Sequence, residues 1–412
     1  MNEFTIAGRR DEVGRWRPVA AYALLAASTQ LLWLTFAPLT TASAHHYHVS
    51  ETAIGWLAEI FPLFYVVLAL PAGRLLDRGF HRWLGVGAVL TALGGLVRLA
   101  GADFAWALLG QLLVATGQPL VLNAVTKVAG EHLPPRLRPH GIAVGSAAIF
   151  AGMLLALILG TALGGHHIQA LLELQAAFAL VAALAVLYGL RRRAGAGAPE
   201  DEDVVAVPLF ALREVWAQPN VRVLSGLLFL GFGVFIALTT WLQALLHNYR
   251  VSSTTAGTLL VGMVLAGAVG AAALPPIVVR RRAERRTVAV AVAVAVVGSL
   301  VLAFEHAVAL DAVVLVAIGL MLLTLLPVIL ELSERRAGAS AGTVTALMWL
   351  AGNAGGLVVA VLVAVLVHHP LAAFLALAVI SLLATPLVAA LATDSSSEET
   401  PLAAELATQT SG

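Results

Sequence analysis

The sequence has no cysteine and very little charge. The absence of cysteine excludes disulfide bonds, cysteine-ligated zinc sites and thiol nucleophiles. Charged residues make up 11% of the 412 residues, whereas soluble domains carry about 25%. Among the 24 basic residues Lys127 is the only lysine. Because the net charge is only +1, the chain offers no basic surface for nucleic acid, and we expect no such partner.

Hydrophobic residues take the place of charge, at 60% of the chain and a mean hydropathy of +0.93. They gather in runs long enough to cross a bilayer core about 30 Å thick as helices. We therefore predict an all-α integral membrane protein whose partners include the lipid bilayer. The twelve predicted spans are 19–43, 53–76, 83–101, 104–130, 138–165, 168–190, 222–247, 254–279, 286–304, 308–334, 338–367 and 370–392.

The basic residues predict the orientation of these helices. All of them except Arg98 and Arg250 fall in tails and turns on one side, which the positive-inside rule places in the cytoplasm. Both termini are then cytoplasmic, and the expected location is the cytoplasmic (inner) membrane. A long polar stretch separates the first six spans from the last six. The predicted parts are a cytoplasmic tail 1–18, a bundle 19–190, a linker 191–221, a bundle 222–392 and a disordered tail 393–412.

A polar string ends the second span on the cytoplasmic side, Gly73-Arg74-Leu75-Leu76-Asp77-Arg78-Gly79-Phe80-His81-Arg82. It resembles the signature of the major facilitator superfamily, Gly-x-x-x-Asp-Arg-x-Gly-Arg-Arg, with one residue fewer before the second glycine. Gly73 would permit close helix packing, and Asp77 would meet a helix N-terminus and an arginine across the bundle. Arg78 and Arg82 would stay with the headgroups. Such a network would latch one conformation; alternatively, these are ordinary positive-inside residues at a helix end.

This resemblance implies two pseudo-symmetric six-helix bundles that move a small solute by alternating access. It also implies a monomer without a cofactor. The matching turn of the second half, 270–286, keeps the basic cluster and lacks the acidic residue, as a degenerate second copy would.

Three further stretches carry a narrower resemblance. They are Gln30 to Pro38, with Ile54 to Leu57 and Pro71 to Asp77; Gly117 to Lys127, with Pro134 to Arg136; and Pro327 to Glu331, running into Gly338 to Gly342. They are similar to the feline leukaemia virus subgroup C receptor-related family and its prokaryotic relatives. Animal members of that family are associated with choline and ethanolamine transport and with a disputed haem role.

The narrower resemblance implies that Trp33 covers a quaternary ammonium group and that Gln118 is a central polar contact. An indole face attracts a desolvated cation by about 1–2 kcal/mol, and an amide in lipid is costly unless it faces a cavity. The alternatives are ordinary bundle packing for Trp33 and a helix–helix hydrogen bond for Gln118.

The chain also departs from that family's pattern. Ile236 stands where the family has a tyrosine, although Trp241 follows five residues later, and Trp349 stands where it has a glutamine, with Asn353 one turn later. We expect a small organic cation such as choline or ethanolamine; another amine or a small anion of the cyanate-porter kind remains open. Helices 1, 4, 7 and 10 line the cavity in the superfamily, and the expected solute-binding residues are Trp33, Gln118, Asn123, Thr239, Thr240, Trp241, Trp349 and Asn353.

Proton coupling requires an ionisable group at membrane depth. Glu59, about two turns into the second span, is the candidate; the alternative is an acid that faces an outward vestibule and has no coupling role. Lys127 and Glu331 lie near cytoplasmic ends and are predicted to pair across the two halves as a gate. Uniport and symport both remain open.

Other classes of protein fit the sequence less well. A membrane enzyme would need convergent catalytic groups, and the sequence has no Walker motif, nucleophile elbow or paired intramembrane carboxylates. A receptor or sensor would normally bring a sizeable soluble domain, and a channel would repeat pore segments. The neighbouring His45, His46 and His48 are expected to hold no metal. We predict a secondary transporter, not an enzyme.

Overall fold

The computed structural model describes residues 16–134, 137–163, 167–194, 216–305, 307–337 and 341–391. Within these ranges the regular structure is helical throughout, without a strand. Among the described residues, 12 helices are long and apolar enough to cross a membrane. The predicted all-α membrane architecture is confirmed. The predicted tail 393–412, most of the tail 1–18 and most of the linker 191–221 lie outside the described residues.

The helices form two compact units, and the division does not follow the order of the chain. The first unit contains residues 1–206 together with 239–264, and the second contains 207–238 together with 265–412. Two helices, α11 (Pro219–His247) and α12 (Ser253–Ala273), contribute residues to both units. The division into two pseudo-symmetric six-helix bundles, 19–190 and 222–392, stays a prediction.

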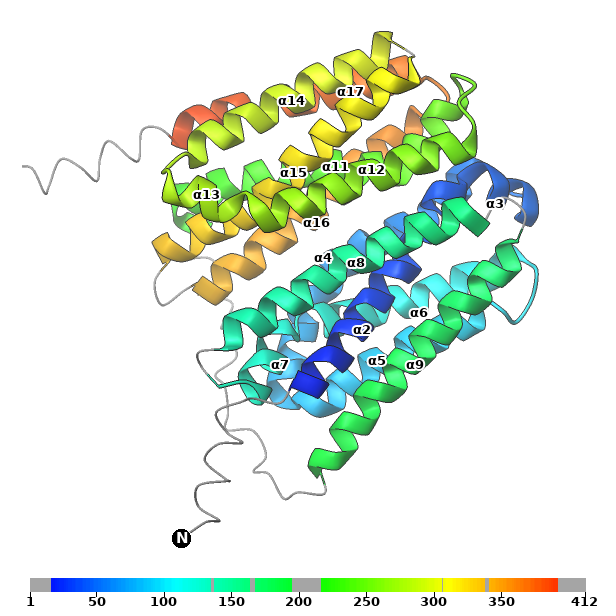
Figure 1. Ribbon diagram of the computed structural model, residues 1–412, viewed down its shortest axis with the longest axis vertical. Helices are drawn as coiled ribbons and strands as arrows, with labels where there is room; N and C mark the ends of the chain where they lie inside the picture. Colours follow the sequence, from blue (N-terminus) through cyan, green and yellow to red (C-terminus); the bar gives the residue numbers. More distant parts are fainter. Residues whose placement is uncertain are drawn as a thin grey trace, which may run out of the picture. The chain divides into compact units, whose positions relative to one another are not determined.

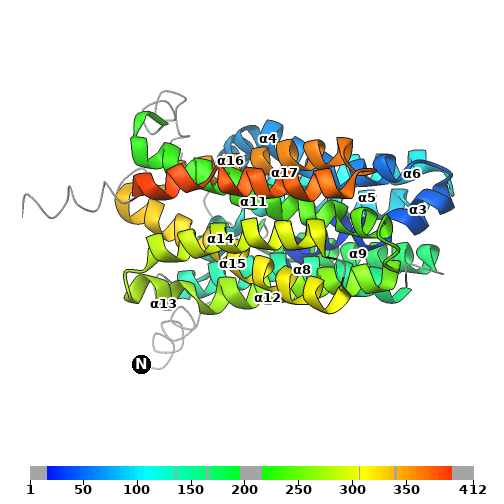
Figure 2. The ribbon, with the colours of Figure 1, turned by 90° about the horizontal axis from the view of Figure 1, so that it is seen from above.

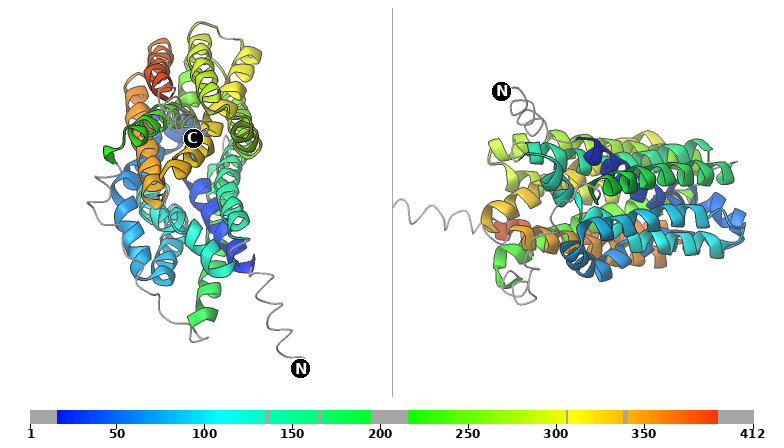
Figure 3. Two further views of the ribbon diagram at one scale, coloured as in Figure 1. Left: turned by 90° about the vertical axis from the view of Figure 1, so that its left-hand side faces the viewer. Right: turned by 90° about the horizontal axis from the view of Figure 1, so that it is seen from below.

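The first unit is built on α2, which packs against α6, α8 and α9, while α5 packs against α6 and α9 (Figures 1 and 3). Glycines allow the closest approach: a Cβ atom added at Gly94 of α5 would lie 2.6 Å from the carbonyl oxygen of Gly110 in α6. The elements are α2 (Trp16–Trp33), η1 (Ala37–Leu39), α3 (Thr40–Tyr47), α4 (Glu51–Arg78), α5 (Phe80–Val97), α6 (Phe104–Leu122), α7 (Val125–His132), α8 (Arg138–Leu163) and α9 (Ile168–Ala194).

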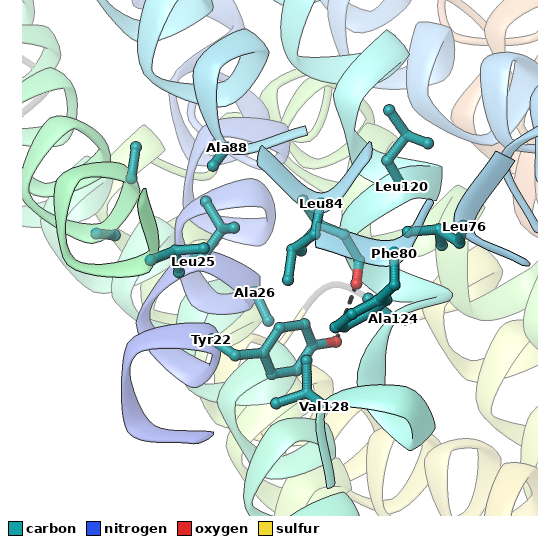
Figure 4. Close-up of a cluster of buried hydrophobic side chains, with 14 of the residues drawn as sticks. Tyr22, Leu25, Ala26, Leu76, Phe80, Leu84, Ala88, Leu120, Ala124 and Val128 are labelled. Carbon is teal, nitrogen blue, oxygen red and sulfur yellow. Dashed lines mark hydrogen bonds between the residues drawn. The ribbon is translucent and has the colours of Figure 1, made fainter. Parts of the chain in front are cut away.

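A buried apolar cluster holds the first unit together where α2, α4, α5, α6, α7 and α9 meet (Figure 4). Tyr22 of α2 lies among these side chains, and its hydroxyl donates a hydrogen bond of 3.0 Å to the carbonyl oxygen of Val121. That carbonyl lies near the end of α6. A tyrosine whose hydroxyl has such a partner can be buried at little cost.

The second unit contains the first part of α11 and the last part of α12. Its other helices are α13 (Pro275–Arg280), α14 (Glu284–Phe304), α15 (Val308–Ala337), α16 (Ala341–Val365) and α17 (Pro370–Leu382). Helix α14 packs against α15 and α17, and α16 packs against α15 (Figure 2). A Cβ atom at Gly355 would overlap the backbone of Phe229, so α16 touches α11 at main-chain level.

We name the two ends of the first unit after the predicted topology. The outer end carries the turns at 48–50 and 248–252, and the inner end carries Gly79 and residues 133–134.

Candidate solute-binding site and its supports

The first membrane span is interrupted directly after Trp33. Helix α2 ends at Trp33, residues 34–36 form a turn, and η1 contains Pro38 before α3 begins. The span predicted over 19–43 is present as Trp16–Tyr47, but it is not one continuous helix, because Pro38 has no N–H to continue the helical hydrogen bonds. Such a break inside a membrane span leaves carbonyl groups that need side-chain donors.

Pro62 interrupts the hydrogen bonds of α4 next to this break. It lacks the N–H that would bond to the carbonyl oxygen of Ala58. The indole Nε1 of Trp33 donates to that oxygen instead, at 2.9 Å. The Trp33 ring is 6% exposed and lies against Phe61, with ring centroids 6.1 Å apart. Helix α4 therefore fixes the orientation of the predicted solute-binding indole.

Gln118 and Asn123 lie at the end of α6. Gln118 directly precedes Pro119 inside the helix, and Asn123 is the residue that caps its C-terminus. Gln118 is buried, with 4% of its surface exposed. The Asn123 amide donates to the carbonyl oxygen of Ala69 at 3.0 Å and accepts from the Tyr65 hydroxyl at 2.8 Å. Asn123 thus joins α6 to α4, a packing role that was not predicted for it.

Glu59 is fully buried and points toward the part of α11 that belongs to the first unit. The Thr240 hydroxyl lies near its carboxyl group but forms no hydrogen bond with it. Within the described residues neither carboxyl oxygen of Glu59 has a hydrogen-bond partner, and no ion pair includes it. A negative charge at this position would be uncompensated.

Trp241 of α11 meets α4 at Gly55, one helical turn before Glu59. Its fully buried ring packs so closely on Gly55 that a Cβ atom there would overlap it. Thr239 is buried on the same segment of α11. The structure therefore brings Glu59, Thr240 and Trp241 together in one unit, and Trp33 reaches the same part of α4 through Ala58, the residue next to Glu59.

The inner end of the first unit has an ion pair that was not predicted. The Lys127 ammonium lies 2.6 Å from Asp77 Oδ1 and donates to the carbonyl oxygen of Leu76 at 3.1 Å. Lys127 therefore caps the last turn of α4 while it neutralises Asp77. The structure thus pairs Asp77 with a lysine, where an arginine was expected, and the predicted partner of Lys127, Glu331, has a side chain outside the described residues.

Three other residues of the polar string 73–82 were given roles from the sequence: Gly73, Arg78 and Arg82. A Cβ atom added at Gly73 would have no heavy atom within 4 Å among the described residues, so the close packing expected there stays a prediction. Arg78 and Arg82 are exposed, as positive-inside residues are, and the Arg82 guanidinium lies over the Trp83 ring at 5.6 Å from its centroid.

In the second unit, the predicted residues of α16 pack on α11. The Trp349 ring meets Phe232 edge to face, with centroids 6.3 Å apart. The Asn353 amide donates to the carbonyl oxygen of Trp349 at 2.9 Å, within its own helix. Ile236 is fully buried against Gly356. Each of these contacts lies within the second unit.

A buried polar cluster around Arg98 was missed from the sequence. Arg98 is 2% exposed, and it donates from Nη1 to Thr35 Oγ1 at 3.0 Å and from Nη2 to the carbonyl oxygen of Leu32 at 2.9 Å. Nη2 also bonds to Gln111 Oε1. One signal was available: Arg98 and Arg250 were the exceptions to the charge pattern.

Contacts at the outer end were also missed. The Gln243 amide accepts from the backbone N–H of Thr41 at 3.1 Å and donates to Thr41 Oγ1 at 2.9 Å and to Ser253 Oγ at 3.2 Å. Thr41 Oγ1 in turn donates to Glu51 at 2.7 Å, and Glu51 lies 3.6 Å from His247. These residues tie the outer ends of α11 and α12 to α3 and α4.

Comparisons with known proteins agree with this architecture. A family model for the Major Facilitator Superfamily matches residues 19–360. Solute carrier family 49 member A3 of Danio rerio is 29% identical over 271 residues, which are 62% of this chain and 57% of that protein. The Xenopus tropicalis protein of the same name is 24% identical over 374 residues, 84% of this chain and 77% of that protein. The choline/ethanolamine transporter FLVCR2 of Homo sapiens is 28% identical over 119 residues, 28% of this chain and 23% of that protein.

Solved structures share the fold at low sequence identity. The peptide transporter POT in complex with sulfate superposes with a TM-score of 0.73 at 14% identity, covering 92% of this chain and 94% of that one. An inward-facing bacterial homolog of the human lysosomal transporter Spinster gives 0.66 at 15% identity, covering 91% and 96%. The chain therefore belongs to the Major Facilitator Superfamily, and 12 helices among its described residues are long and apolar enough to cross a membrane.

Proposed function

We propose that this protein is a secondary transporter that moves a small organic cation across the inner membrane by alternating access, with choline and ethanolamine as the first candidates. One observation carries the proposal: the indole of Trp33 is held beside the helix turn that contains Glu59, a buried acid without a cation or a hydrogen-bond partner among the described residues. An aromatic face and a carboxylate are the two groups that bind an ammonium ion.

The relatives support the same class of solute. FLVCR2 of Homo sapiens is named a choline/ethanolamine transporter, and its match to this chain covers only 28% of it. Trp33 and Gln118 are both buried in the first unit. The other predicted contacts of the solute stay predictions; they are Gln118, Asn123, Thr239, Trp349 and Asn353.

Glu59 has one of two roles in this proposal. It binds the ammonium group directly, or it takes up a proton whose gain and loss select the conformation, because an uncompensated charge in a dry interior is costly. Replacement by glutamine separates the roles. Glu59→Gln abolishes binding in the first case, and in the second it leaves solute exchange intact while removing the dependence of uptake on a pH gradient.

Alternating access needs contacts that close each end in turn. At the outer end, Gln243 bonds to Thr41 and Ser253, and opening toward the outside would break these bonds. At the inner end, the pair Asp77–Lys127 is a proposed part of the latch, and the pair Lys127–Glu331 stays a prediction. Cytoplasmic termini and a monomeric state belong to the same proposal.

The test is solute binding and uptake by the purified protein. At a hundredfold excess over its Kd, a ligand adds about 2.7 kcal/mol to the free energy of unfolding, so choline and ethanolamine should raise the melting temperature. Trp33→Ala should abolish that increase, and Trp56→Ala, a control at an indole that is 39% exposed, should leave it unchanged. Stabilisation by cyanate or other small anions only, unaffected by Trp33→Ala, would overturn the organic-cation proposal.

A further inference from the structure

Arg98 is an expensive residue in its position. Helix α5 ends at Val97, and the Arg98 side chain turns into the interior, passing Gly110 so closely that a Cβ atom there would lie 2.5 Å from Arg98 Cγ. Among the described residues no carboxylate forms an ion pair with Arg98, which is 2% exposed. A buried, unpaired cation is strongly unfavourable unless its hydrogen bonds compensate. The groups that accept hydrogen bonds from Arg98 therefore indicate what the residue does.

The first of these groups belong to the break in the first span. Helix α2 stops at Trp33, so the carbonyl oxygens of Leu31 and Leu32 lack the backbone donors of a continuing helix and accept from side chains instead. Arg98 Nη2 bonds the carbonyl of Leu32 at 2.9 Å, and Nη1 bonds Thr35 Oγ1 at 3.0 Å. The Thr35 hydroxyl lies 2.7 Å from Gln175 Oε1 of α9, to which it donates. Arg98 therefore holds the chain on both sides of Trp33.

The second group belongs to the interrupted part of α4. Gln111 accepts from Arg98, and its Nε2 donates to the carbonyl oxygen of Leu57 at 3.0 Å. Leu57 precedes Ala58, whose carbonyl receives the Trp33 indole N–H. The backbone at the end of α2 and the backbone that accepts the indole bond are thus both connected to one guanidinium group.

A guanidinium suits this task better than an ammonium group does. It is planar, carries five N–H donors in a fixed fork, and stacks on aromatic rings. Here its fork spans the carbonyl, hydroxyl and amide acceptors, and its carbon lies 5.9 Å from the centroid of the Phe36 ring. Lysine would keep the charge and lose the simultaneous bonds.

We propose that Arg98 is a positioning residue for solute binding: through Thr35, Leu32 and Gln111 it sets the orientation of the Trp33 indole. Its effect on solute rests on the proposed function, whereas the orientation of the indole does not. The test therefore begins with a readout that needs no solute.

The readout is 19F NMR of protein in which all 8 tryptophans are 5-fluorotryptophan, with the Trp33 resonance assigned from Trp33→Phe. Arg98→Lys and Gln111→Met should each shift or split the Trp33 resonance and leave the other indoles in place, because among the described residues only the Trp33 indole donates a hydrogen bond to the backbone that this cluster holds. Arg250→Lys, the matched control at an exposed outer arginine, should move none.

An unchanged Trp33 resonance in both folded variants would overturn the proposal. If Arg98→Lys disturbs every indole, Gln111→Met decides, since it removes no charge: a change confined to Trp33 supports the positioning role, and a change in all indoles or in none overturns it. In choline uptake, both variants should raise KM by about tenfold, the loss from one misplaced indole–cation contact, with a smaller change in maximal rate. If the unaltered protein takes up no choline, the proposed solute is wrong while the resonances still decide the role of Arg98.

Discussion

The carbonyl oxygen of Ala58 receives its hydrogen bond from Trp33 because Pro62 stands where the backbone donor would be. Trp33→Phe keeps an aromatic ring and removes the donor, which leaves a buried carbonyl without a partner. That loss costs about 1–3 kcal/mol. Pro62→Ala restores a backbone N–H to the same oxygen. We therefore expect Trp33→Phe to lower the free energy of unfolding by about 1–3 kcal/mol in the unaltered protein, where residue 62 is proline. In the Pro62→Ala variant, the same substitution should cost at least about 1 kcal/mol less.

The assay is unfolding in detergent of four purified proteins, analysed as a double-mutant cycle. They are the unaltered protein, Trp33→Phe, Pro62→Ala and the variant with both substitutions. The smaller ring of phenylalanine loses the same packing in both backgrounds, so this loss cancels in the coupling energy. Trp106→Phe, at an indole that is 38% exposed, should show no coupling to Pro62→Ala. A coupling below about 0.5 kcal/mol, which is within the additivity of independent sites, would refute the reasoning.

Three further predictions concern the helix ends. Gly55→Ala places a methyl group inside the Trp241 indole and should destabilise the protein by about 1–3 kcal/mol. Gly73→Ala on the same helix, where no described atom lies within 4 Å of an added Cβ atom, should not. Equal melting temperatures of the two variants would contradict this. Lys127→Met removes the 2.6 Å pair with Asp77 and should cost about 1 kcal/mol, less at high salt. Adding Asp77→Asn should then cost nothing more, and a further loss would argue against the pair. Gln243→Leu removes three hydrogen bonds at the outer end, so a single cysteine introduced there should react faster with a membrane-impermeant thiol reagent; an unchanged rate would show that these bonds do not close that end.

The spans could be predicted from the sequence because lipid imposes one requirement on every helix. Each backbone group must find its partner within its own segment, so length and apolarity are enough to recognise a span. The same requirement explains the error in the first span. Pro38 was visible in the sequence, and a proline removes a donor wherever it stands, yet hydropathy alone treats the run as uninterrupted.

The contacts of the site could not be predicted in the same way. The partner of the Trp33 indole is a backbone carbonyl 25 residues away, and a carbonyl has no signature in a sequence. Asp77 and Lys127 were both recognised as charged groups near a helix end, but their pairing depends on how α6 and α7 return to α4. Arg98 stood out in the charge pattern, although nothing in the sequence indicated that its side chain turns inward.

The bond between Trp33 and Ala58 affects how relatives of this protein should be compared. A tryptophan that completes the hydrogen bonds of a neighbouring helix has a structural role that does not depend on the identity of the solute. A tryptophan at this position in two proteins therefore does not by itself indicate that they transport the same solute. Differences in the transported solute should be sought first at positions 236 and 349, where isoleucine and tryptophan stand in this chain.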